Sequence, residues 1–452
     1  MTRWWLERAW LGDGGVVDGV IVEAVDGVFT RVGTGPPDGA ERLPGLTIPG
    51  LANCHSHAFH RALRARTQRE RGTFWTWREQ MYSVAARLTP DSYFELARAV
   101  YREMVSVGIT TVGEFHYLHH GPDGTPYDDP NAMGSALLAA ADEAGLRIAL
   151  LDTCYLAAGI GREPEGVQVR FSDGSAEAWA ERVSRRPVTS SATRRSNTQA
   201  GAGSAHGAAI HSVRAVPREQ MKNVVDWAAE HDAPLHVHLS EQVAENDACL
   251  EAYGATPTQV LAGVGALGPR TSAVHATHLS SEDVALLGGS RTFACFCPTT
   301  ERDLGDGIGP SRALHEAGSR LTLGSDSHAV VDLLEEMRAV ELDERLATRE
   351  RGHWSAAELL DAASATGHAS LGFPTAGRIA VGCRADLVTL DTRSPRTAGT
   401  GADEGTAVFA ATAADVTHVV ADGRVVARAG DAEEVGRELD VAIVVTWKEL
   451  EQ

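Results

Sequence analysis

Short apolar runs alternate with longer amphipathic stretches through the central part of the chain. The apolar runs are typical of buried β-strands, and the stretches between them have the 3.6-residue spacing of helices. The runs lie at 108–112, 147–151, 235–239, 271–275, 291–296 and 321–324. The clearest amphipathic stretches lie at 91–107, 217–231 and 333–346. This repeated alternation over roughly 300 residues predicts an α/β fold whose parallel sheet closes as a (β/α)8 barrel.

The two ends of the chain have a different pattern. Val20 and Val22 lead to an Asp26-Gly27 turn, which is typical of a β-hairpin. A similar β pattern returns in 377–391 and 415–430. We therefore expect the terminal segments to pair into a small β-sandwich domain beside the barrel. The predicted boundaries are 1–47 for its first part, 48–372 for the barrel, and 373–452 for its second part with a terminal segment.

One internal segment, 184–209, has neither pattern. It is rich in Ser, Thr, Arg, Gly and Ala and shows no periodicity. Such a composition predicts a mobile surface loop.

Composition and charge narrow the classes of partner. The formal net charge is −20 and the pI is about 5.3, so a broad basic field for nucleic acid or an anionic membrane is not expected. The N-terminus lacks the apolar core of a signal peptide, and no apolar run reaches the roughly 18 residues that a membrane helix needs. The six cysteines are scattered and form no CxxC pair, which indicates buried thiols. We expect a soluble, cytoplasmic protein.

Polar side chains follow several of the predicted strands. His55 and His57 come directly after an apolar run, and their i, i+2 spacing places both imidazoles on one side of a strand. His238, His275 and Asp326 end three later runs. One histidine at a strand end is more often a packed residue than a ligand. Because barrel strands bring their carboxyl ends to one face, however, four such motifs in series predict a metal site there.

These motifs resemble those of the amidohydrolase superfamily, in its aminohydrolase and deaminase branch. The resemblance rests on PGLANCHSH, HVHLSE, VHATH and GSDSH. It implies that the metal ligands are His55, His57, His238 and Asp326. It also implies catalytic roles for Glu241 as a proton shuttle, for His275, and for Asp326 as the acceptor of a proton from water.

The lysine content bears on the number of metal ions. Binuclear members of the resembled superfamily bridge two ions with a carboxylated lysine on a central strand. The lysines of this chain are Lys222, in a predicted helix at 219–229, and Lys448, near the C-terminus, so neither is placed to do this. We therefore expect one divalent metal ion per chain. His and Asp ligands favour Zn²⁺, and Fe²⁺ would also fit.

A narrower resemblance is carried by HSHAFHRAL, FWTWREQMY, GEFHYLHH, HSVRAV and CPTTERDLGDGI, which are similar to motifs of the formimidoylglutamate deiminases of histidine degradation. It implies that the substrate is held by His60, Arg78, Tyr117, His211 and Arg214. Two guanidinium groups suit a substrate with two carboxylates. His60 stands where this family often has Gln, which leaves its role open.

The resemblance implies hydrolytic deamination of N-formimidoyl-L-glutamate, a small dicarboxylate amidine, to N-formyl-L-glutamate and ammonia. Two alternatives remain at this point. One is a deaminase of the same branch that acts on a purine, an adenosine derivative or an s-triazine; the other is a metal-binding barrel without catalysis. By analogy with the family we also expect a homodimer.

Overall fold

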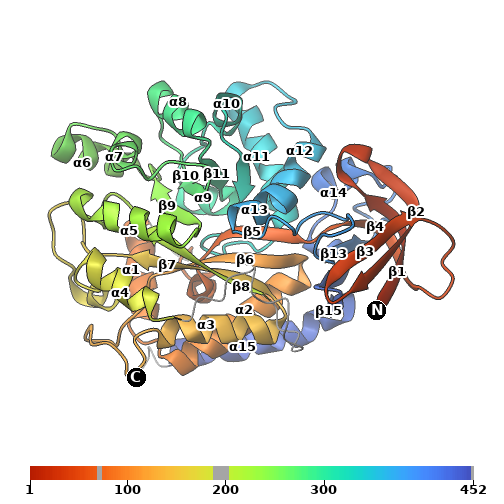
Figure 1. Ribbon diagram of the computed structural model, residues 1–452, viewed down its shortest axis with the longest axis horizontal. Coiled ribbons are helices and arrows are strands. Elements are labelled where there is room, and N and C mark those ends of the chain that lie inside the picture. Colours follow the sequence, from red (N-terminus) through yellow and green to blue (C-terminus); the bar gives the residue numbers. More distant parts are fainter. Residues whose placement is uncertain (69–73, 187–202, 449–452) are drawn as a thin grey trace.

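The computed structural model describes residues 1–68, 74–186 and 203–448. Its centre is an eight-stranded parallel sheet that curves into a nearly closed barrel, with the strands in sequence order from β5 to β12 (Figure 1). The strands are β5 (Leu51–Ser56), β6 (Ile109–His116), β7 (Arg147–Cys154), β8 (Ser204–Ile210), β9 (Leu235–Leu239), β10 (Thr271–His275), β11 (Phe293–Phe296) and β12 (Leu321–Leu323). Each apolar run predicted as a strand lies in this sheet. The predicted (β/α)8 architecture is confirmed.

Strand β8 was not expected, because it lies in the segment predicted as a surface loop. The prediction of a loop is wrong for 204–209 and falls outside the described residues for 187–202. The strand sequence SAHGAAI consists mostly of small residues with low β propensity, so no apolar pattern reveals it. Its small residues are required by packing: a Cβ at Gly207 would come within 2.6 Å of the Leu151 side chain. Tertiary contacts with β7 and β9 therefore decide the conformation here.

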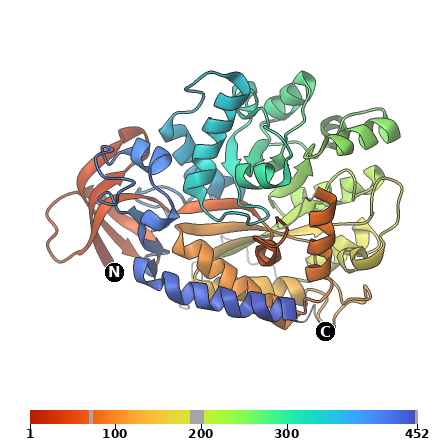
Figure 2. The same cartoon turned by 180° about the vertical axis from the view of Figure 1, so that it is seen from behind.

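Helices cover the outside of the barrel and connect its strands (Figures 1 and 2). They are α1 (Phe74–Ala85), α2 (Pro90–Ser106), α3 (Ala132–Ala144), α4 (Ala176–Ser184), α5 (Arg218–Glu230), α6 (Val243–Tyr253), α7 (Pro257–Gly263), α8 (Ser281–Ser290), α9 (Pro298–Leu304), α10 (Ser311–Ala317), α11 (Leu333–Thr348), α12 (Ala356–Asp361) and α13 (Gly367–Ser370). Helix α2 shows why they form where they do. It begins at a capping box between Thr89 and Ser92, and its apolar face, including Leu96 and Val100, is buried.

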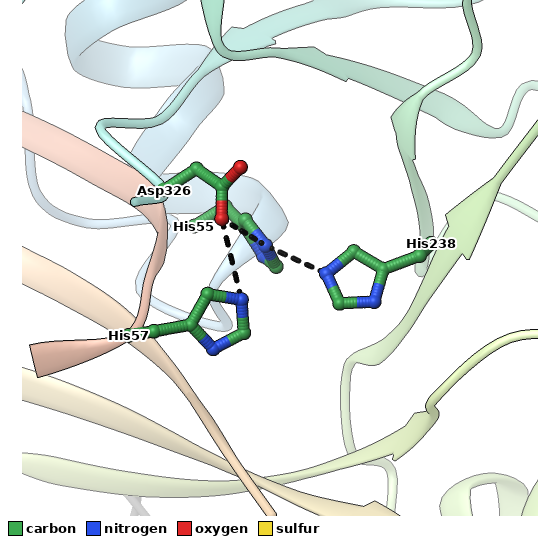
Figure 3. Close-up of side chains that lie close together, drawn as sticks. All are labelled: His55, His57, His238 and Asp326. Carbon is green, nitrogen blue, oxygen red and sulfur yellow. Dashed lines mark hydrogen bonds and ion pairs between the residues drawn. The ribbon is translucent and has the colours of Figure 1, made fainter. Parts of the chain in front are cut away.

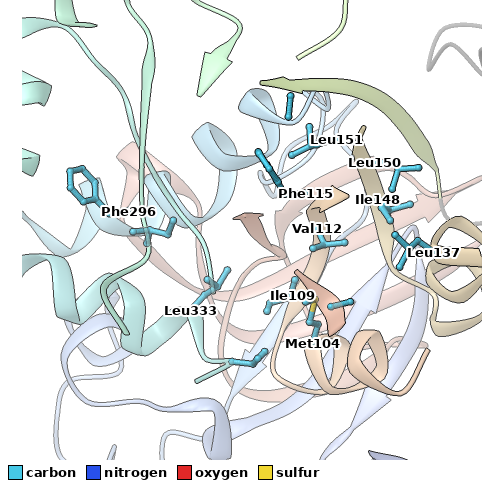
Figure 4. Packing of buried hydrophobic residues seen from close by; sticks show 14 of the residues in the cluster. Met104, Ile109, Val112, Phe115, Leu137, Ile148, Leu150, Leu151, Phe296 and Leu333 are labelled. Carbon is cyan, nitrogen blue, oxygen red and sulfur yellow. The ribbon is translucent and has the colours of Figure 1, made fainter. Parts of the chain in front are cut away.

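Side chains fill the space between the sheet and its helices. Figure 4 shows Val112 and Phe115 of β6 beside Ile148, Leu150 and Leu151 of β7. Every residue of β6 and β7 is buried, as expected for parallel strands that are covered on both faces.

The barrel closes between its first and last strands, β5 and β12, over only a short distance. Asp326 donates its backbone N–H to the carbonyl of His55 at 2.9 Å, and His57 donates to the carbonyl of Asp326 at 3.3 Å. The Asn53 amide bonds to Ser325 from both of its ends, at 2.7 and 2.9 Å. A Cβ at Gly324 would lie 2.7 Å from the Cβ of His55, so only glycine permits this approach. This seam therefore positions His55, His57 and Asp326 together.

The small β-sandwich domain is a seven-stranded sheet in the order β15-β14-β13-β4-β1-β2-β3. Its strands are β1 (Thr2–Trp10), β2 (Val16–Val25), β3 (Val28–Thr34), β4 (Glu41–Pro49), β13 (Leu387–Leu390), β14 (Val416–Ala421) and β15 (Arg424–Arg428). The two ends of the chain meet where β4 pairs with β13. The short helix α14 (Glu404–Phe409) lies between β13 and β14 in the sequence.

The last helix, α15 (Ala432–Lys448), leaves the small sheet. It runs along the outside of the barrel against α2, as both views of the ribbon show (Figures 1 and 2). Within the described part of the chain, no helix combines the length and the apolar character needed to cross a bilayer.

Candidate metal centre and active-site cavity

Four side chains converge at the carboxyl ends of β5, β9 and β12 (Figure 3). The Nε2 atoms of His55 and His57 lie 3.4 and 3.3 Å from Oδ1 of Asp326. The Nε2 atom of His238 lies 3.0 Å from Nε2 of His55. Ligand atoms about 2.1 Å from a tetrahedral Zn²⁺ lie roughly 3.4 Å apart, so the spacing matches such an ion.

The hydrogen bonds of the imidazoles point their free nitrogens at one another. Nδ1 of His57 donates to the carbonyl of Phe115 at 3.0 Å, and Nδ1 of His238 donates to the carbonyl of His211 at 3.0 Å. When these two rings hold one proton each, their Nε2 atoms carry the lone pairs. Nε2 of His55 faces both Nε2 of His238 and Oδ1 of Asp326, and one proton on it can be donated to only one of them. A divalent cation would instead bind all of these acceptor atoms. This donor set fits a metal ion.

Burial favours the neutral forms of His55 and His238. It lowers the pKa of His55 to about 4 and that of His238 well below its ordinary value. Burial opposes ionisation of Asp326 as well, but the neighbouring His55 and His57 side chains hold the pKa of this carboxyl well below its usual range. Neutral imidazoles and an ionised carboxylate are the forms that bind a metal.

The backbone at these strand ends is strained. Ser240, His275 and Asp326 have φ values of +50°, +69° and +41°, a region that side chains other than glycine rarely adopt. Each such residue costs of the order of 1 kcal/mol and persists only where surrounding contacts impose it. Here the strain turns the side chains of His275 and Asp326 toward the same cavity.

His275 lies among three carboxylates. Its Nδ1 is 3.3 Å from Oε1 of Glu301, and its Nε2 is 3.9 Å from Oε1 of Glu241 and 3.7 Å from Oδ2 of Asp326. Glu301 is itself fixed by the backbone N–H of Cys297 at 2.9 Å. Although burial disfavours the imidazolium, Glu241 and Glu301 raise the pKa of His275 well above its ordinary value. His275 is thus oriented as a charged donor.

A buried carboxyl supports the turn that carries the first two histidines. Glu114 accepts hydrogen bonds from the Ser56 hydroxyl and the Ala58 backbone N–H, both at 2.7 Å. Burial raises the pKa of Glu114 to about 7. The same Ser56 hydroxyl contacts His328 at 2.9 Å, so Ser56 links β5 to the residues that follow Asp326.

A cavity of about 250 Å³ opens over the four-residue cluster of His55, His57, His238 and Asp326. The structure brings the predicted substrate-binding residues into its wall: His60, Arg78, Tyr117, His211 and Arg214. Glu241, His275 and Asp326 also line it. His60 lies 3.0 Å from the Tyr117 hydroxyl through its Nε2. Burial lowers the pKa of His60 well below its ordinary value, so this ring enters the wall as a neutral hydrogen-bonding group rather than as a charge.

Several residues of this site were not anticipated from the sequence. Glu245 on α6 lies 3.3 Å from Nε of Arg214, and Tyr82 and Tyr155 add hydroxyl groups to the cavity wall. Glu245 follows Glu241 by four residues, a spacing that could have drawn attention to it on a helix. Single tyrosines show no sequence pattern, and these two come from α1 and from the loop after β7.

A second group of possible ligands lies outside the cavity. His116, His119 and Asp152 approach one another and are buried. Asp152 is already bound by Arg182 at 2.7 Å and by Arg186 at 2.8 Å. Two guanidinium groups on one carboxylate oppose a further cation, so this cluster does not fit a metal.

His236 and the two lysines do not belong to the four-residue cluster. His236 is buried in the barrel and is not among the described residues that could hold an ion. Lys222 lies on the exposed side of α5, where its Nζ pairs with Asp226 at 2.7 Å. Lys448 is exposed at the end of α15. Neither lysine approaches the strand ends that carry the ligands.

A barrel of this topology with clustered His and Asp side chains at its strand ends defines a hydrolase of the amidohydrolase type. The model of the Amidohydrolase family matches residues 46–426, and the chain belongs to this family, whose members typically bind a divalent metal ion. The protein is therefore a hydrolase that acts on carbon–nitrogen bonds.

Three known proteins place the chain more narrowly. It is 39% identical to the formimidoylglutamate deiminase of Pseudomonas aeruginosa over 446 residues, which cover 95% of each chain. The crystal structure of an amidohydrolase from Brucella melitensis superposes with a TM-score of 0.89 at 30% identity, over 99% of this chain and 100% of that one. The atrazine chlorohydrolase of Arthrobacter aurescens, complexed with zinc, has a TM-score of 0.84 at 22% identity, over 98% and 100% of the two chains, which shows a shared fold.

Proposed function

We propose that the protein deaminates N-formimidoyl-L-glutamate by hydrolysis, producing N-formyl-L-glutamate and ammonia. The observation that carries this proposal is the cavity that joins the four-residue cluster to Arg78 and Arg214. An amidine at the cluster would leave the two carboxylates of a glutamate within a wall of guanidinium, imidazole and hydroxyl donors. The similarity to the deiminase of Pseudomonas aeruginosa supports the same substrate.

We propose one Zn²⁺ per chain as the resident cofactor, held by His55, His57, His238 and Asp326. Three imidazoles and one carboxylate at tetrahedral spacing favour this ion, and the zinc of the atrazine chlorohydrolase supports the choice. When bound, the ion would lower the pKa of water and so make a nucleophile available near neutral pH.

Three side chains of the protein transfer protons or stabilise charge during the reaction. Asp326 accepts the proton that the attacking water loses, because its Oδ2 faces His275 and is not needed for the contacts of Oδ1. The charged His275 donates toward the oxygen of the tetrahedral centre and stabilises the charge that develops there. Glu241 relays the protons that the attacking water gives up to the departing nitrogen, which leaves as ammonia. Water, rather than a side chain, attacks the amidine carbon.

Ammonia release from a small substrate panel tests this proposal. Purified protein with measured metal content is given N-formimidoylglutamate, guanine, adenosine and an s-triazine in parallel. We expect rapid ammonia release from the first compound and little from the three aromatic compounds. A preference for an aromatic compound would contradict the proposal in favour of a ring deaminase, and no release from any of them would favour a binding protein.

The charged cavity wall argues against the ring deaminases. A purine or triazine is flat and carries no carboxylate, so it would offer no anionic group to the donors that Arg78, His211 and Arg214 place in the cavity wall. The four-residue cluster lies beside Glu241 and His275, which can transfer or donate protons, and this argues against a metal-binding barrel without catalysis.

A further inference from the structure

A buried glutamine lies directly behind the cavity wall. Gln168, in the short 3₁₀ helix Gly166–Phe171 (η3), is only 3% exposed. Its Nε2 lies 3.0 Å from the Tyr82 hydroxyl and 2.8 Å from the Tyr155 hydroxyl. Both tyrosines line the cavity, whereas Gln168 does not. Gln168 therefore joins two cavity residues that come from different parts of the chain.

The orientation of the Gln168 amide is determined by the backbone. The N–H of Glu165 lies 3.1 Å from Oε1 of Gln168 and can only donate. The other end of the amide must therefore be its NH₂ group, which donates one hydrogen to each tyrosine. Each hydroxyl oxygen consequently receives a hydrogen bond from behind the wall.

Tyr82 receives a second hydrogen bond as well. Nε of Arg78 donates to the same hydroxyl oxygen at 2.5 Å. With both lone pairs of Tyr82 used, its O–H group can only donate. It can donate to a ligand or to Tyr155, whose pKa is raised first by burial and also by the neighbouring Tyr82 hydroxyl. In either arrangement the O–H of Tyr155 remains available to a ligand.

We propose that Tyr82 and Tyr155 are specificity-determining residues that present only hydrogen-bond donors to a substrate carboxylate, and that Gln168 is the positioning residue that orients them. This deepens the proposed function and rests on it for the identity of the substrate. Arg78 and Tyr82 also line a shallow groove on the outer side of this wall. The wall thus faces the carboxylate farthest from the amidine, which is the side-chain carboxylate of glutamate.

Three substrates separate this role from a general structural one. N-formimidoylglutamate has both carboxylates, N-formimidoyl-4-aminobutyrate keeps only the distal one, and N-formimidoyl-2-aminobutyrate keeps only the one beside the amidine. In Tyr155→Phe and Tyr82→Phe, we expect kcat/KM to fall about 10- to 100-fold for the two substrates with a distal carboxylate, mainly through KM. For the third substrate kcat/KM should stay nearly constant. Equal losses on all three substrates would overturn the inference.

Matched variants sharpen the comparison. Tyr127→Phe removes a hydroxyl that accepts from Arg170 outside the cavity, and it should leave all three substrates unaffected. Gln168→Leu removes the donors behind both tyrosines. Gln168→Glu replaces these donors with acceptors. A carboxylate would accept hydrogen bonds from both tyrosine O–H groups and turn them away from the substrate. Gln168→Glu should therefore weaken the distal-carboxylate substrates more than Gln168→Leu does, and the opposite order would contradict the positioning role.

A binding measurement keeps this inference separate from the proposed activity. If the wild-type protein releases no ammonia from any of the three amidines, the proposed function fails, and glutarate binding to the metal-loaded protein decides the inference. Calorimetry should then show glutarate binding that weakens at least about tenfold in the double variant Tyr82→Phe/Tyr155→Phe and not in Tyr127→Phe. An unchanged Kd, or no glutarate binding by the wild type, would overturn it.

Discussion

The guanidinium group of Arg214 is paired with a carboxylate that is almost fully buried: Nε of Arg214 lies 3.3 Å from Oε2 of Glu245. A terminal nitrogen of the same guanidinium lies 3.5 Å from Oε2 of Glu241. Burial raises the pKa of Glu245, and Arg214 opposes that rise. Arg214 therefore faces the cavity from a position held by α6, rather than as a free cation.

This pairing predicts a large loss of stability when only one partner is removed. Arg214→Met leaves the Glu245 carboxylate buried without a counter-charge, which should lower the free energy of unfolding by about 3 kcal/mol. Urea denaturation followed by circular dichroism measures the change. The double variant Arg214→Met/Glu245→Leu should recover much of the loss, because neither charge then remains buried. Equal instability of the single and double variants would contradict a direct pairing.

Replacement of the proton shuttle should abolish turnover while the metal site persists. In Glu241→Gln the side chain keeps its shape but cannot carry a proton, so kcat for the formimidoyl substrate should fall about 10²- to 10⁴-fold. Elemental analysis should still find metal at the wild-type level. Glu251→Gln, on the exposed side of the following helix α6, is the control and should retain full activity. Retained activity in Glu241→Gln would defeat the assigned role.

Metal removal should destabilise the protein through the four-residue cluster. Chelation would leave the nitrogens of His55 and His238 facing each other at 3.0 Å, and Tm should fall. Restoring the ion to about 1,000 times its Kd should return about 4 kcal/mol of stability. Differential scanning calorimetry before and after chelation, and after Zn²⁺ addition, measures this.

Two variants locate that effect in the molecule. His238→Gln should lose both the bound metal and the response to chelation. His116→Gln, in the cluster occupied by Arg182 and Arg186, should retain the wild-type metal content. If His116→Gln lost the metal and His238→Gln kept it, the ion would be bound at His116, His119 and Asp152, and the assignment would be contradicted.

Buried neutral histidines should make the protein sensitive to acid. Burial and the nearby Arg147 lower the pKa of His368 to about 4, while its Nδ1 donates to the carbonyl of Ser364 at 2.8 Å. Between about pH 4 and 6.5 the unfolded chain binds this proton and the folded chain does not, so stability falls as the pH decreases through that window. At pH 5 the cost for this one residue is about 2 kcal/mol.

His368→Asn isolates this contribution. An asparagine amide can still donate to Ser364 and does not titrate. Between pH 7 and pH 5 the variant should lose about 2 kcal/mol less stability than the wild type, as measured by urea unfolding. Parallel pH profiles for the two proteins would contradict the assignment.

The barrel and its ligands could be predicted because strong local signals coincide with structural position. The buried runs around Ile148 and Val274 are continuous in sequence, and His55 and His57 follow such a run directly. Strand β8 could not be found in this way, because its small residues form a strand only between β7 and β9. Gln168, Tyr82 and Tyr155 are likewise scattered residues whose shared role depends on three separate segments meeting in space.

The seam between β5 and β12 also sets the order in which the molecule can be completed during synthesis. His55 emerges from the ribosome early, but its partner strand and Asp326 follow only after most of the barrel has been translated. The β4 strand likewise waits for β13 near the other end of the chain. The cluster is therefore assembled from contacts of very long sequence separation, which form slowly. A nascent or truncated chain can contain His55 and His57 and still be unable to retain an ion. Metal uptake would therefore report that the fold is complete.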